Sequence, residues 1–245
     1  MLTVVIPLYN EEGAAHPVVT AWDDQLARLG IDYELRVYDD GSRDATGSIL
    51  EKLARERTRV IAVRQTNRGH GPTILRGYRE ARGEWVFQVD GDDEMSPASF
   101  PGFWSRREEA DLVIGCRSGR ELPVGRRIIS VVSRTAVRLL FGPGVRDVNV
   151  PYRLYRRTAL AEMLALVPEK TFAPNVILVG LAVSKGLRIV ELPVPYRTRQ
   201  TGESSLGRLR MWTCAATAFW QTLRVAMWAR SQANLGQRGS RAGSA

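Results

Sequence analysis

The sequence WVFQVDGDDE, residues 85–94, joins a short apolar run to a cluster of carboxylates. Residues 85–89 have the aromatic and β-branched content of a buried strand, and the acidic residues follow it directly. Similar runs occupy residues 2–6, 33–38, 59–63 and 111–115, and helix-like stretches such as 43–57 and 70–82 lie between them. This alternation predicts an α/β fold with a Rossmann-like, mainly parallel sheet flanked by helices.

The residues that directly follow the predicted strands have the strongest claim to function, because ligands of such sheets bind beyond the carboxyl ends of the strands. These positions hold Tyr9 to Glu11, Asp39 to Ser42, Asn67 to Gly69, Asp90 to Glu94 and Arg117. We therefore expect acidic and glycine-rich loops along one edge of the sheet.

Two of these loops suggest specific chemistry, and each has a simpler structural alternative. Alternating carboxylates at Asp90 and Asp92 can hold a divalent cation that takes its other ligands from substrate phosphates and water. The same residues could form a polar turn in which Asp93 or Ser96 caps the next helix. The loop after Asp39 could accept hydrogen bonds from a nucleobase or ribose, or could supply a helix cap.

Composition excludes several classes of protein. With 245 residues, 44% hydrophobic and 25% charged, the chain is neither disordered nor a small stapled scaffold. Cys116 and Cys214 lie far apart and no histidine flanks them, which argues against a disulfide framework or a zinc site. The net charge of +9 predicts an anionic partner, and charge alone leaves open nucleic acid, an acidic membrane surface or a phosphorylated ligand.

The second half of the chain is less regular. We expect helices near 126–141, 157–166 and 172–185, a strand near 187–194, and a helix over 206–229 with apolar residues spaced three or four apart. That apolar face either covers the core or lies at a lipid headgroup boundary, and helix 126–141 offers the same choice. The tail is predicted to be disordered. We expect no secretory signal and no membrane-spanning segment.

Three motifs in order, Pro7-Leu-Tyr-Asn-Glu11, Asp39-Asp-Gly-Ser42 and Asp90-Gly-Asp92, resemble those of the family-2 nucleotide-sugar glycosyltransferases. The resemblance covers about residues 1–205. It is strongest to the dolichol-phosphate mannose synthase and polyprenyl-phosphate glycosyltransferase branch, because counterparts exist there for the following features: Gly115-Cys-Arg117, helix 126–141, Asp147 with Tyr152-Arg153, Glu191-Leu-Pro-Val-Pro195 and Arg199 to Ser204. It implies an A-type glycosyltransferase fold with a catalytic domain at 1–205, an amphipathic helix at 206–230 and a tail at 231–245.

The resemblance also implies roles for individual residues. The residues that would bind the nucleoside are Pro7, Tyr9, Glu11 and Asp39, with Asp40 nearby. Asp90 and Gly91 would contact the donor, and Arg117 and Arg199 would bind its phosphates. Asp92 and Glu94 would hold Mg²⁺ or Mn²⁺, and Asp92, Arg117 and Arg199 would stabilise the departing diphosphate. The chain departs from the branch at Glu94, where Gln is usual, and at Ser205, where a Lys would face the diphosphate.

The implied reaction is metal-dependent, inverting transfer of a sugar from GDP-mannose or a UDP-sugar to a polyprenyl or dolichyl phosphate. No Glu-Asp or Asp-Asp pair follows Asp93 to deprotonate a hydroxyl, whereas a phosphate monoester is already anionic near neutral pH. Asp147 and Glu169 stay open as bases.

Two alternatives to this reading are a family-2 transferase acting on a saccharide or other hydroxyl acceptor and a basic nucleic-acid-binding protein. Carboxylates at three strand ends oppose the nucleic-acid reading. We expect an enzyme bound peripherally to an anionic membrane at its inner, cytoplasmic face, with no nucleic acid as partner, and leave open a membrane protein partner.

Overall fold

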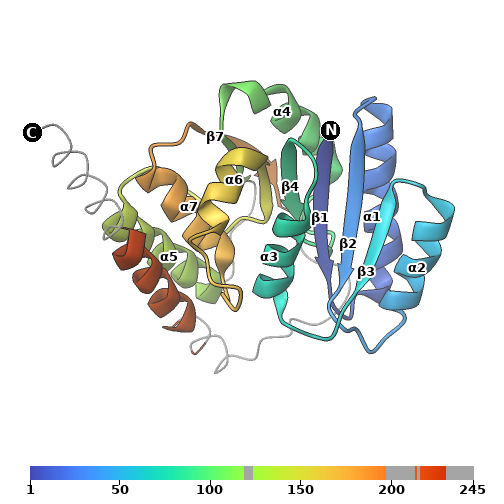
Figure 1. The fold of residues 1–245 in the computed structure, drawn as a ribbon, viewed down its shortest axis with the longest axis horizontal. Coiled ribbons are helices and arrows are strands. Elements are labelled where there is room, and N and C mark those ends of the chain that lie inside the picture. Colours follow the sequence, from blue (N-terminus) through green and yellow to red (C-terminus); the bar gives the residue numbers. More distant parts are fainter. Residues whose placement is uncertain (119–123, 197–212, 214–215, 230–245) are drawn as a thin grey trace, which may run out of the picture.

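The computed structural model describes residues 1–118, 124–196, 213 and 216–229, and its elements form a sheet between helices (Figure 1). The strands are β1 (Leu2–Leu8), β2 (Tyr33–Asp39), β3 (Val60–Arg64), β4 (Trp85–Val89), β5 (Leu112–Ser118), β6 (Tyr152–Arg156) and β7 (Ile189–Pro195). The helices are α1 (Glu12–Arg28), α2 (Thr46–Glu56), α3 (His70–Glu80), α4 (Phe100–Ser105), α5 (Val124–Phe141), α6 (Arg157–Leu164) and α7 (Pro174–Ser184). The strands and helices predicted from the sequence are confirmed to within a few residues.

The sheet has the order β3-β2-β1-β4-β6-β5-β7, and four of its six neighbouring pairs are parallel. The antiparallel pairs both involve β6, which lies between β4 and β5 and which the sequence analysis missed. Its sequence, Tyr-Arg-Leu-Tyr-Arg, contains two arginines and does not look like a central strand. Arg153 is nevertheless fully buried, because backbone carbonyls accept its hydrogen bonds.

Helices cover both faces of the sheet, as expected. On one face, Trp22 of α1 and Phe100 of α4 pack against Phe87 of β4 and Tyr152 of β6. On the other face lie α3, α6 and α7, and Tyr78 of α3 packs edge-on against Tyr155 of β6. Tyr152 and Tyr155, three residues apart on β6, thus face opposite layers, because side chains alternate between the two faces along a strand.

The C-terminal helix covers residues 216–229, within the predicted 206–229; residues 206–212 and the predicted tail lie outside the described residues. Its buried side chains are Thr222, Val225 and Ala226, whereas Phe219 and Met227 are exposed. The predicted apolar face, to which Phe219 and Met227 belong, is therefore not the side that packs on the core, and of its two alternatives the core-covering one is wrong for the described part of this helix. None of the described helices is long and apolar enough to cross a membrane.

Candidate active site

The loops after β1 and β2 hold each other through side chain to backbone hydrogen bonds. The Asn10 amide donates to Ser42 Oγ (2.9 Å), the Arg43 amide donates to Asn10 Oδ1 (2.9 Å), and the Glu11 amide donates to Thr46 Oγ1 (2.9 Å). Asn10 has a φ of 54°, a left-handed conformation in which asparagine is enriched. The predicted nucleoside residues Pro7, Tyr9 and Glu11 are thereby brought beside the 39–46 loop.

Asp39 and Asp40, predicted to lie at the nucleoside, are at most 3% exposed, and both support the loops around them. Asp39 Oδ1 accepts the Ser42 amide (2.8 Å), and its Oδ2 lies 3.4 Å from Arg64 Nε. Asp40 accepts the amides of Arg68 and Gly69 and the side chain of Gln65, at 2.7 to 2.8 Å. Asp40 therefore ties the loop after β3 to the end of β2.

Asp90 lies where β4 ends, and three polar residues surround it. Its Oδ1 accepts from Gln88 Nε2 (2.8 Å) and lies 3.4 Å from His70 Nε2. Asn175 of α7 donates in turn to Gln88 Oε1 (3.0 Å). Burial is the main cause that raises the pKa of Asp90, and the charge of Glu94 adds to it. The charges of His70 and Arg153 and the hydrogen bond from Gln88 act in the opposite direction. Gln88 and Asn175 were not among the predicted site residues, although a glutamine inside a buried apolar strand is a detectable signal.

The loop after Asp90 contains the predicted metal ligands. Asp92 Oδ1 accepts the Glu94 amide (3.2 Å), Asp93 has a φ of 58°, and Glu94 is 9% exposed. Gly91 packs so closely on Leu8 and Pro7 that a Cβ there would collide with them. The alternative of a capping role is also realised, because Ser96 Oγ accepts the Ala98 amide (3.2 Å).

The carboxylates of this loop fit a divalent cation completed by other ligands. No group of three or more candidate ligands occurs among the described residues. Two carboxylates, Asp92 and Glu94, suffice for a magnesium-type ion, which is commonly held by one or two carboxylates together with substrate phosphates. Because β4 and β5 are both antiparallel to β6, they end at the same edge of the sheet and bring these carboxylates and Arg117 to that edge.

Arg117, predicted to bind phosphate, lies on β5 in a two-pronged ion pair with Asp147. Nε lies 2.7 Å from Asp147 Oδ2 and Nη2 lies 2.9 Å from Oδ1, with both side chains about 15% exposed. Burial lowers the pKa of Arg117, but the hydrogen bonds and charge of Asp147 outweigh it and raise the pKa overall. Because both Asp147 oxygens face this guanidinium, Asp147 is poorly suited to act as a general base.

Two other predicted residues, Arg199 and Ser205, lie outside the described residues. Glu169, the second candidate base, is 74% exposed beside Arg79, at 3.9 Å. The structure therefore brings together the loops that contain Tyr9, Asp39, Asp40, Asp90 and Asp92 along one edge. Gln88 and His70 lie at Asp90, and Asn175 contacts Gln88.

Proteins with similar sequences identify the family of this chain. Residues 3–164 match the family described as Glycosyl transferase family 2. A Pseudomonas fluorescens protein named undecaprenyl-phosphate 4-deoxy-4-formamido-L-arabinose transferase is 30% identical over 213 residues, or 86% of this chain and 61% of its own. A protein of the same name from Klebsiella pneumoniae is 29% identical, with 86% and 64% covered. The chain thus spans about three fifths of the length of these relatives.

A solved structure extends the comparison to the fold. Glucosyl-3-phosphoglycerate synthase from Mycobacterium tuberculosis, in complex with Mn²⁺, UDP-glucose and glycerol 3-phosphate, superposes with a TM-score of 0.64 at 18% identity. The match covers 92% of this chain and 80% of that one. At this identity the likeness concerns the fold alone.

Proposed function

The chain belongs to glycosyl transferase family 2 and has its A-type fold, and from this premise we propose that it transfers a sugar from a nucleotide-sugar donor to a polyprenyl phosphate, with inversion and with a divalent metal. The observation that supports this most is the convergence of Asp90, Asp92 and Glu94 with Arg117 at one edge of the sheet. This edge is where ligands of such sheets bind.

The donor would lie across the loops at this edge, with its nucleoside near Tyr9, Glu11 and Asp39. Bond breakage places negative charge on the departing nucleoside diphosphate, and Arg117 is a fixed cation close by. Its pairing with Asp147 holds the guanidinium in place before the donor arrives, so less reorganisation is needed during the reaction.

Asp92 and Glu94 would hold the metal, Mg²⁺ or Mn²⁺. A bound divalent ion neutralises charge on the diphosphate and stabilises its departure. Glu94 lies two residues beyond Asp92 in the same loop, and its amide donates to Asp92 Oδ1, so both side chains could serve one ion together with diphosphate and water oxygens.

Two observations support a phosphate as the acceptor group. The relatives in the comparison are named undecaprenyl-phosphate transferases. In addition, Asp147 is engaged by Arg117, and Glu169 is mostly exposed beside Arg79, so neither is placed as a base for a hydroxyl. A phosphate monoester, with a second pKa of about 6, attacks without one.

The second part of the proposal is peripheral attachment to an anionic membrane at its cytoplasmic face. Exposed apolar side chains occur at Phe219, Trp220 and Met227 of the C-terminal helix and at Val132 and Leu139 of α5. Together with the net charge of +9, such helices suit a headgroup boundary. The protein should sediment with vesicles of anionic lipid and be released by high salt; failure to sediment at low salt would refute attachment.

The acceptor is tested by side-by-side assays with radiolabelled donor and metal. We expect transfer to a polyprenyl phosphate and none to the matching polyprenol, because only the first supplies its own anionic nucleophile. Comparable transfer to the alcohol or to a soluble sugar would refute the lipid phosphate and leave the family assignment intact.

The metal site is tested by Asp92→Asn, with Asp93→Asn as the matched control. Asp93 is exposed and adjacent, and asparagine tolerates its positive φ. We expect the first variant to lose nearly all turnover and the metal dependence of donor binding, and the second to keep both. Equal activity of Asp92→Asn and the wild type would reject the assigned ligands.

A further inference from the structure

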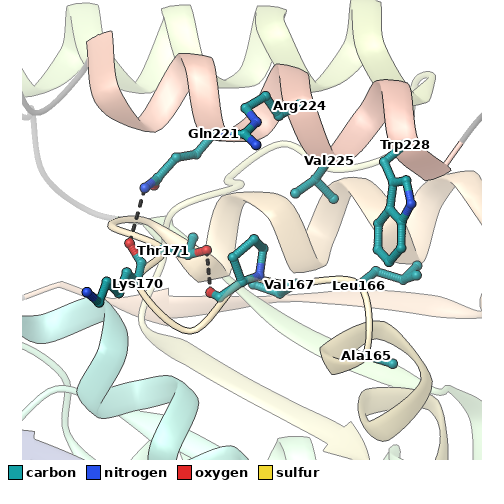
Figure 2. Close-up of a pocket in the computed structure, with 10 residues that line it drawn as sticks. Ala165, Leu166, Val167, Lys170, Thr171, Gln221, Arg224, Val225 and Trp228 are labelled. Carbon is teal, nitrogen blue, oxygen red and sulfur yellow. Dashed lines mark hydrogen bonds between the residues drawn. The ribbon is translucent and has the colours of Figure 1, made fainter.

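Two cavities lie against the C-terminal helix and share part of their walls. One, of about 720 Å³, is lined by α3, residues 169–172 and the first turns of the helix. The other, of about 550 Å³, lies between residues 165–171 and the later turns (Figure 2). Lys170 and Gln221 line both cavities, so the two adjoin, and the hydrogen bond from Gln221 Nε2 to the Lys170 carbonyl lies where they meet. We name the two together the C-terminal groove; its basic end includes Arg68, His70 and Lys170, and its other end includes Leu166, Arg224, Val225 and Trp228.

The basic end reaches the donor site. His70 lines the groove, and its Nε2 lies 3.4 Å from Asp90. Arg68 and Lys170 are exposed, and no hydrogen bond or ion pair with the described residues engages either side-chain charge. Two further arginines of α3 also line this end and are already paired with acidic residues. The groove therefore offers uncompensated positive charge beside the proposed donor.

The apolar end lies farther along the helix. Val225 is 4% exposed and Trp228 is 44% exposed, and Figure 2 shows Trp228 reaching toward Leu166 across the cavity. Gln221 holds the helix in this position, because its Oε1 accepts the Phe172 amide (2.8 Å) and its Nε2 donates to the Lys170 carbonyl (3.1 Å). Apolar side chains gather at this end, which Arg224 also lines, whereas Arg68 and His70 lie at the other end, and this arrangement suits a ligand with an anionic head and a hydrocarbon tail.

We propose that the C-terminal groove binds the acceptor, with the phosphate against Arg68, His70 and Lys170 and the polyprenyl chain along Leu166, Val225 and Trp228. This inference rests on the proposed function and adds where, and in which direction, the acceptor lies. The orientation places the nucleophilic phosphate oxygen on the donor side and the hydrocarbon on the side away from it. The reverse orientation would place the phosphate beside Arg224 and Trp228, away from Asp90 and from the donor that it attacks.

The experiment measures binding of farnesyl phosphate, farnesol and inorganic phosphate to the full chain by calorimetry, without donor or vesicles. Lys170→Ala should weaken the binding of farnesyl phosphate several-fold and leave the affinity for farnesol unchanged. Replacement of a matched surface lysine, Lys185→Ala, should change neither affinity. Trp228→Ala should weaken both farnesyl ligands, by about tenfold at most for a partly exposed aromatic side chain. Trp228→Phe keeps the apolar contact and should restore most of the affinity, and thermal melting verifies that each variant is folded.

Binding and transfer assays on the same variants separate the two proposals. Absence of transfer from the wild type to any polyprenyl phosphate refutes the proposed function. Transfer by the wild type, with Kd and acceptor KM unchanged in both Lys170→Ala and Trp228→Ala, refutes the groove and leaves the function standing. If Lys185→Ala weakens the binding of farnesyl phosphate as much as Lys170→Ala does, the groove is also refuted, because the overall charge of the protein would then explain binding.

Discussion

Replacing Arg153 by Met removes the buried guanidinium group of β6, the strand that was not predicted from the sequence. Arg153 is fully buried on β6 and donates to the carbonyls of Val150 (2.6 Å), Val148 (2.8 Å) and Asn175 (2.8 Å). The substitution leaves three buried carbonyls without these donors, at about 1–3 kcal/mol each. Relief from burying the arginine charge offsets part of that loss, because desolvating an ion costs several kcal/mol.

The net loss we expect is about 3–5 kcal/mol, the range typical of breaking a buried charged network. This is a large share of the roughly 5–15 kcal/mol that holds a domain folded. Urea unfolding followed by circular dichroism measures it. Arg153→Lys keeps the charge but offers one nitrogen in place of three, so it should fall between Met and the wild type.

Arg156→Met is the matched control, because Arg156 lies on the same strand, pairs with the exposed Glu84 and Glu108 and stacks over Trp85. Exposed pairs contribute about 0–1 kcal/mol, and the ring contact adds about as much. The loop 148–150 that Arg153 holds follows Asp147, the partner of Arg117, so Arg153→Met should also lower turnover. A loss below about 1 kcal/mol for Arg153→Met, or an equal loss for Arg156→Met, would contradict the assigned role of Arg153.

Three further changes test the packing and charges. Gly71→Ala would place a Cβ against the backbone carbonyls of residues 171–172, so we expect the free energy of unfolding in urea to fall by about 1–3 kcal/mol. Gly102→Ala, which has open space around it, should be neutral or slightly stabilising. Phe87→Ala removes a fully buried ring that contacts four aromatic residues, and should cost about 3–5 kcal/mol in the same assay. Burial raises the pKa of Glu80, but hydrogen bonds from Arg76, Tyr38 and Arg36 lower it below its usual 4.5, so the charge stabilises the fold above that pH. Unfolding measured between pH 7 and pH 3 should therefore show Glu80→Gln less stable at neutral pH, with the difference shrinking below pH 4.5; a constant difference would contradict this.

The alternation of strands and helices, and the edge at which the polar loops meet, could be predicted from the sequence alone. Both follow from local properties, since apolar runs of strand length and the residues after them can be read without knowing any partner. The loops at Tyr9, Asp39 and Asp90 were predicted in this way, and they lie along one edge of the sheet.

The position of β6, the role of Asp40 and the packed side of the C-terminal helix could not be predicted from the sequence. Each depends on partners distant in the chain: Arg153 can be buried in a strand only because the carbonyls of Val148, Val150 and Asn175 accept its hydrogen bonds. Asp40 ties down the Arg68–Gly69 loop because β3 is the neighbour of β2. The helix buries Val225 rather than Met227 because residues 165–171 lie beside Val225, a contact between segments more than fifty residues apart that no local periodicity contains.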